Sequence, residues 1–229
     1  MPSQKRRRFQ IRQKAKRVEK RRKAIQLSPE EKLRIFREKK MSEKGLYEYS
    51  GMRRTLEGVD RAHRKDFTKI TLELAKRFPG KKLIILDEGA GQSTFYRDLA
   101  ESLRGRVNIQ VIKTDIQKEN RPDFIAAPEE LAKLFGKDKF HLIVSTFGGV
   151  NYTNISALKA IGNIIAVLAR GGEAHLIMNA ENYTGISPRL KQLWKRHGNI
   201  RVRQTITANS IGHDSLNVER IAITIIKRK

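Results

Sequence analysis

Two carboxylates and two glycines lie close enough together in the chain to do chemistry as one group. The stretch from Leu86 to Phe95 reads LDEGAGQSTF and follows the apolar run at 83–85. A strand that ends in a glycine-rich turn and leads into a helix places backbone N–H groups beside a ligand. The spacing therefore indicates a backbone that comes close to a phosphate, a dinucleotide or a methyl donor, or that only turns tightly.

The side chains of this turn separate the alternatives. A phosphate-binding P-loop needs lysine before its serine or threonine, and the sequence Gln92-Ser93-Thr94 has none. A dinucleotide turn follows the pattern G-x-G-x-x-G, whose third glycine is replaced here by Thr94. A turn without a ligand leaves Asp87 and Glu88 unexplained, because charge beside a buried strand is costly unless it is paired.

The segment ILDEGAGQS resembles the first motif of the class I S-adenosylmethionine-dependent methyltransferases, an apolar strand ending in Asp or Glu, one residue, then Gly-x-Gly. A cationic ammonium and sulfonium suit an acidic turn, whereas a pyrophosphate does not. The resemblance implies that the turn surrounds the amino-acid part of the cofactor. The residues so implied are Asp87, Glu88, Gly89, Ala90, Gly91 and Gln92.

The resemblance continues in order along the chain. VIKTDI ends in Asp115, 24 residues after Gly91, where a carboxylate can accept ribose hydroxyls, although NAD-binding folds use the same device. FIAAPEEL resembles the segment beside the adenine, FHLIVST the fourth strand, and VLARGGEAHLIM a helix, a Gly-Gly turn and the fifth strand. The cofactor contacts implied here are Asp115, Ile116, Ala126, Ala127, Ser145 and Thr146.

The surrounding pattern predicts an α/β fold with a Rossmann-like doubly wound sheet, mostly parallel with a C-terminal antiparallel hairpin. Short apolar runs alternate with helical segments at 59–78, 94–104 and 155–169, which is typical of a parallel sheet covered on both faces. The β-branched runs at 200–208 and 220–227 are joined too closely for a covering helix. A helix C-cap explains Gly171-Gly172 as well as a functional role does.

Two parts follow from charge and periodicity. We expect residues 1–57 to form a basic N-terminal extension, an arm plus a short helix at about 28–40, and residues 58–229 to form the domain that carries the resemblance to methyltransferases. The chain has 49 Lys and Arg against 24 Asp and Glu, a formal net charge of +25. A charge of this size attracts polyanions, so RNA is the expected partner. The arm residues expected to bind nucleic acid are Lys5, Arg6, Arg7, Arg8, Arg12, Lys14, Lys16, Arg17, Arg21, Arg22 and Lys23; as an alternative, the arm is a solvated tail or a localisation signal.

Composition also excludes several classes of site. The absence of cysteine excludes a disulfide framework, a zinc knuckle and a cysteine nucleophile. The five histidines lack metal-ligand spacing, so no metal is expected, and His141 and His175 lie inside strand patterns, where packing is the better interpretation. No apolar stretch approaches the roughly 20 residues that span a bilayer. We expect a soluble protein without a membrane partner, cytoplasmic, or nucleolar if the source is eukaryotic.

The methyl acceptor is harder to read, and the sequence identifies no catalytic residue. Amino-methylating members of the family carry Asp/Asn/Ser-Pro-Pro-Tyr/Phe after the fourth strand, whereas this chain has the segment STFGGVNY at 145–152, without prolines. The candidate acceptor contacts are Ser145, Phe147, Asn151 and Tyr152, although packing explains the two aromatic residues equally well. We expect an RNA methyltransferase acting on ribosomal or transfer RNA, free or within the ribosome. The alternatives are a catalytically inert RNA- or ribosome-binding protein and a protein methyltransferase with a basic substrate.

Overall fold

The computed structural model describes residues 54–152, 157–207 and 220–228, which belong to a compact unit from Met52 to Lys229. The basic residues of the arm and the helix expected at 28–40 lie outside the described residues. Within the described ranges, no helix has both the length and the apolar character that crossing a membrane requires.

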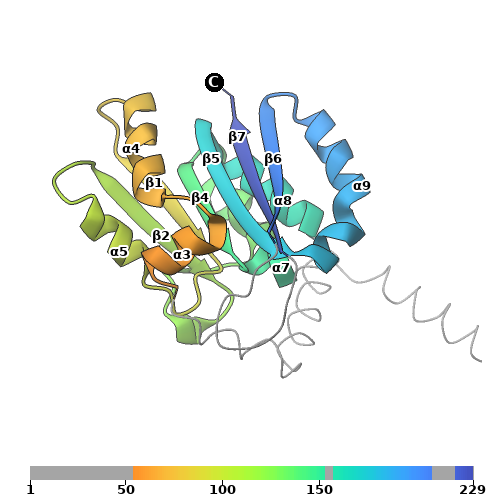
Figure 1. Cartoon of the computed structure of the whole chain (residues 1–229), viewed down its shortest axis with the longest axis horizontal. Coiled ribbons are helices and arrows are strands. Elements are labelled where there is room, and N and C mark those ends of the chain that lie inside the picture. The colour runs from red at the N-terminus through yellow and green to blue at the C-terminus, as the bar shows by residue number, and fades with distance from the viewer. Residues whose placement is uncertain (1–53, 153–156, 208–219, 229) are drawn as a thin grey trace, which may run out of the picture. The chain divides into compact units, whose positions relative to one another are not determined.

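A single seven-stranded sheet organises this unit (Figure 1). In order across the sheet, the strands are β3 (Phe124–Ile125), β2 (Ile109–Asp115), β1 (Leu83–Glu88), β4 (Phe140–Thr146), β5 (Leu168–Asn179), β7 (Arg220–Lys227) and β6 (Ile200–Thr207). Strands β1 to β5 pair in parallel, and β7 is antiparallel to both β5 and β6. The predicted Rossmann-like sheet with a terminal antiparallel hairpin is confirmed.

Helices cover the sheet on both faces. They are α3 (Leu56–His63), α4 (Phe67–Arg77), α5 (Phe95–Ser102), α6 (Leu131–Phe135), α7 (Gly149–Tyr152), α8 (Ala157–Val167) and α9 (Ala180–Arg196), with short 3₁₀ turns at Lys118–Asn120 and Pro128–Glu130. Leu83 and Ile85 of β1 belong to a core cluster with residues of α4 and α5, whereas Leu86 belongs to a second cluster that includes residues of α8. Because successive strand residues point to opposite faces, β1 is buried from both sides, as its apolar run predicts.

Two local expectations were wrong. The helix expected at 59–78 is two helices, because Arg64 is left-handed (φ 52°) and Asp66 caps α4 by accepting the Lys69 N–H at 2.8 Å. The helix expected from about 155 to 169 is present as α8, which ends at Val167, whereas the Gly171-Gly172 pair lies inside β5 at a break in register with β4. A Cβ on Gly172 would lie 2.8 Å from the His141 carbonyl oxygen, so this glycine permits close strand approach instead of capping a helix. Helix α9 was not expected at all.

Candidate functional site

The glycine turn after β1 touches the turn after β4. Gly89 and Gly91 both have positive φ, 62° and 55°. A Cβ on Gly89 would lie 2.4 Å from the Cα of Gly148 and 2.7 Å from the nitrogen of Gly149. Strands β1 and β4 are parallel neighbours, so their carboxyl ends meet at one sheet edge, the place where open α/β sheets bind ligands. Only glycine fits at position 89.

Glu88 fixes the turn after β4. Its carboxylate accepts the Ser145 hydroxyl at 2.6 Å through Oε2 and the Gly149 N–H at 3.0 Å through Oε1. Burial raises the pKa of Glu88 to about 7, although these two hydrogen bonds oppose the shift. Both carboxylate oxygens are thus engaged by donors from the neighbouring turn, and Glu88 links the two turns.

Asp87 carries a buried oxygen that lacks a partner. The residue is 4% exposed, and its Oδ2 has no hydrogen bond within the described part of the chain. Burial raises the pKa of Asp87 to about 7, opposed chiefly by the charge of Arg54. A bound cation close to this carboxylate would lower its pKa and stabilise its charge.

Asp115 joins the ends of β1, β2 and β3. It accepts the Gly91 N–H through Oδ2 and the Gln117 N–H through Oδ1, both at 2.8 Å. Each oxygen of a carboxylate has a second lone-pair site, so Asp115 can still accept hydroxyls. Its carbonyl accepts the Ala126 N–H at 3.0 Å.

The other predicted cofactor residues lie around this junction. Ala90 is buried and its N–H donates to the Thr114 carbonyl at 3.0 Å, whereas Gln92 is exposed. Ala126 and Ala127 are buried, while the Ile116 side chain is 38% exposed directly after Asp115. An exposed aliphatic side chain beside a carboxylate is a suitable neighbour for a nucleoside.

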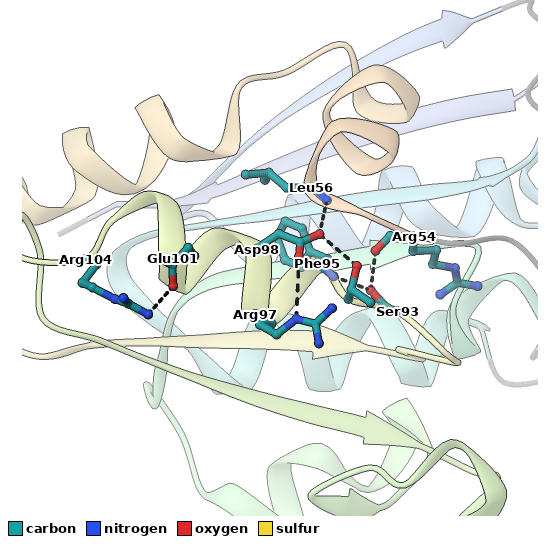
Figure 2. A network of polar contacts seen from close by, with 9 residues as sticks. Arg54, Leu56, Ser93, Phe95, Arg97, Asp98, Glu101 and Arg104 are labelled. Atoms are coloured by element: carbon teal, nitrogen blue, oxygen red, sulfur yellow. Dashed lines mark hydrogen bonds and ion pairs between the residues drawn. The ribbon is translucent and has the colours of Figure 1, made fainter.

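Arg54 is a site residue that sequence reasoning missed. Its carbonyl accepts the N–H groups of Thr94 and Phe95 at 3.2 and 2.9 Å and the Ser93 hydroxyl at 2.9 Å, at the N-terminus of α5 (Figure 2). Its guanidinium donates to the Gly89 carbonyl. The segment before α3 therefore lies on the glycine turn. An arginine in a stretch without periodicity gave no signal that could have revealed this.

A second contact beside Arg54 fastens the same segment. The Leu56 N–H donates to Asp98 of α5 at 3.2 Å, and the Thr94 hydroxyl donates to the same Asp98 oxygen at 2.9 Å (Figure 2). The Thr94 side chain does not cap a backbone N–H of the helix. The first turn of α5 thus depends on residues 54–56 for several of its polar partners.

The candidate acceptor residues are only partly brought together. Ser145 is fully buried beneath the turn, with its hydroxyl on Glu88. Phe147 has φ 51°, an uncommon conformation for a residue with an aromatic side chain, and packs with Ala62 and Ile177. Asn151 and Tyr152 lie in α7, and their side chains are outside what the structure describes.

The carboxyl end of β4 also contacts a buried histidine. The Thr146 hydroxyl lies 2.9 Å from Nε2 of His63, which stacks edge-on against Phe67. Burial, reinforced by His175 and nearby cations, holds the pKa of His63 well below its ordinary value, so this ring is neutral at pH 7. The two histidines in strands pack in the sheet, as their positions predicted: His175 is buried, and Nδ1 of the half-buried His141 accepts the Ile84 N–H at 3.0 Å.

No protein-family model matches the sequence. No curated protein matches it either. Among solved structures, the chain is similar to a SAM-dependent methyltransferase from Archaeoglobus fulgidus, with 10% identity, TM-score 0.45, and coverage of 73% of this chain and 97% of that one. A putative rRNA methylase from Clostridium thermocellum has 16% identity, TM-score 0.47, and coverage of 70% and 96%.

A third similar structure is also that of a methyltransferase. It is the 1,6-didemethyltoxoflavin-N1-methyltransferase of Burkholderia thailandensis, at 15% identity and TM-score 0.42, covering 71% of this chain and 78% of that one. In this chain β7 lies antiparallel between β5 and β6, so the sheet is mostly parallel with a C-terminal antiparallel hairpin.

Proposed function

We propose that the protein is an S-adenosylmethionine-dependent methyltransferase that acts on RNA. The observation that carries the cofactor assignment is the buried Asp87 oxygen without a hydrogen-bond partner in the described part of the chain, beside a glycine turn that has no phosphate-binding lysine. A buried anionic site favours a cationic ligand, and the donor's amino-acid part carries an ammonium beside the sulfonium.

The residues at the sheet edge fit the three parts of such a donor. Asp87 would face the cationic amino-acid part, Asp115 would accept the ribose hydroxyls, and Ile116 would lie against the base. The bound donor would supply an electrophilic methyl group on its sulfonium. The chain's own contribution is orientation, because Glu88 and Asp115 fix the turns that surround the donor, and methyl transfer depends chiefly on in-line positioning.

RNA is the proposed acceptor because of charge. The net charge of +25 favours association with a polyanion, and ribosomal or transfer RNA is the polyanion that we propose. The loop STFGGVNY departs from the proline motif of amine methylation, so we propose no acceptor atom. Two alternatives remain: an inert RNA- or ribosome-binding protein, favoured by the missing motif, and a methyltransferase acting on a basic protein.

Calorimetric titration with S-adenosylmethionine and S-adenosylhomocysteine tests the cofactor. The parent protein is expected to bind both, and Asp87→Asn to bind each at least tenfold more weakly. Glu119→Gln is the matched control, because it removes an exposed carboxylate close in sequence to Asp115 and should leave binding unchanged. Failure of the parent protein to bind either ligand refutes the proposal.

Transfer of tritium from labelled donor identifies the acceptor class. Label in cellular RNA supports the proposal and excludes an inert protein. Label in protein alone assigns the third function, and binding of donor without transfer to either assigns the second.

A further inference from the structure

The end of the fold formed by α9 and β6 is strongly basic. Residues 183–205 contain six Lys or Arg and no Asp or Glu. All six side chains are exposed. We call this set the α9–β6 surface: Arg189, Lys191, Lys195, Arg196, Arg201 and Arg203.

The packing of α9 and β6 explains why these cations face solvent. Helix α9 buries Ile186 and Leu190 in the core, and Val202 of β6 packs against the same cluster. Because strand residues alternate between faces, Arg201 and Arg203 point away from α9. β6 is the edge strand and pairs with β7 alone, as Figure 1 shows, so the cations lie on both sides of this edge.

The charge of this surface is not neutralised by neighbours. In the described ranges, none of the six cations forms an ion pair, whereas Arg61 and Arg104 on other helices are each paired with a glutamate. Exposed Arg228 adds a further cation next to this surface. Its backbone N–H donates to the Asn199 carbonyl at 2.7 Å, which holds it beside the turn between α9 and β6. One role of cations on an edge strand is to prevent edge-to-edge association of sheets. That role explains Arg201 and Arg203 but not the four cations on α9.

We propose that the α9–β6 surface binds the phosphate backbone of the RNA substrate; this inference rests on the proposed function. Exposed, unpaired Lys and Arg contact phosphates without reading sequence, and so set the position of a nucleic acid. Strand β6 runs in the same direction as β5, so it begins at the end of the sheet far from the glycine turn and runs toward the end that carries the site. Arg201 thus lies about 20 Å along the strand from Thr207, at roughly 3.3 Å per residue. The surface takes phosphates far from the methylated nucleotide.

The test is the salt dependence of RNA binding by the full-length protein. The probe is a fluorescein-labelled RNA hairpin with a stem of about 16 base pairs, the span of a double-stranded RNA-binding domain. The variant Lys195→Gln/Arg196→Gln/Arg201→Gln/Arg203→Gln is compared with a control that loses the same charge elsewhere, Lys69→Gln/Lys76→Gln/Lys81→Gln/Lys82→Gln, all exposed. Anisotropy gives the slope of log affinity against log salt concentration.

We expect the slope of the α9–β6 variant to fall by about 3, since each lost phosphate contact removes about 0.7–0.9. In the control, the slope should change by less than the value of one phosphate contact, about 0.7–0.9. An unchanged slope, or an equal fall in the control, overturns the proposal. Polyglutamate serves as a second probe that imitates an acidic protein. If the α9–β6 variant binds RNA as before but binds polyglutamate more weakly, the surface belongs to an acidic protein partner and the proposal is overturned. Calorimetry with S-adenosylhomocysteine, expected to be unaffected in both variants, separates this result from failure of the cofactor assignment.

Discussion

Substitution of Gly89 by alanine tests whether the two turns at the site touch as described. Position 89 has φ 62°, which costs an alanine about 1–2 kcal/mol. The new Cβ would also meet the Gly148 Cα at 2.4 Å and the Gly149 nitrogen at 2.7 Å. These are backbone atoms that no rotamer change can move, so overpacking should add about 1–3 kcal/mol.

Gly105 supplies the matched control, because it has φ 70° but a Cβ added there would meet nothing within 4 Å. Gly105→Ala should therefore lose only the conformational part, and the difference between the variants isolates the contact. Urea and thermal unfolding measure both, with about 2–4 °C in Tm for each kcal/mol in a domain of this size. Equal losses in the two variants would refute the close approach of the turns.

Three further results are expected. The pKa of Asp87 is about 7 in the folded state, against an ordinary value of 3.8, so the folded protein loses stability as pH rises from about 4 to about 7. Asp87→Asn removes this loss. It should therefore raise the free energy of unfolding at pH 8 by at most about 4 kcal/mol and change it little at pH 4. Arg54→Gln should raise the pKa of Asp87 further, because the charge of Arg54 lowers it; carbon-13 NMR titration of the carboxyl group can follow this, and an unchanged titration would contradict the effect of that charge. Lys227→Met should cost about 1–3 kcal/mol, because Nζ donates to Asp138, Ile165 and Leu168 at 2.7, 3.0 and 2.8 Å, whereas loss of the exposed Arg228 side chain should cost little.

Regular patterns in the sequence predicted the sheet well. The strands β1, β4 and β5 are buried from both sides, so their apolar residues form continuous runs. Such runs can be recognised as strands from the sequence alone. The glycine turn could also be predicted from the sequence, because positive φ and close backbone approach both require glycine. The break between α3 and α4 was hidden, since Arg64 takes a left-handed conformation that its residue type does not announce.

Long-range polar contacts were the part that the sequence could not supply. Glu88 was expected beside the cofactor, and nothing in its neighbours revealed that Ser145 and Gly149, 57 and 61 residues away, would engage both its oxygens. Asp115 was placed correctly at the end of its strand, yet its bonds to the Gly91 and Gln117 N–H groups depend on two turns meeting in space. Helix α9 was missed because Gly185 and Pro188 interrupt its pattern.

The position of Arg54 bears on where this chain can be shortened. A fragment that begins at residue 58, where the change in composition suggests a boundary, lacks the carbonyl that receives the Thr94 and Phe95 N–H groups and the N–H that reaches Asp98. Such a fragment would expose the first turn of α5 to water and leave the Gly89 carbonyl without the Arg54 guanidinium. Ligand affinities measured on it would describe a different turn, so truncation studies should retain the chain from before Arg54.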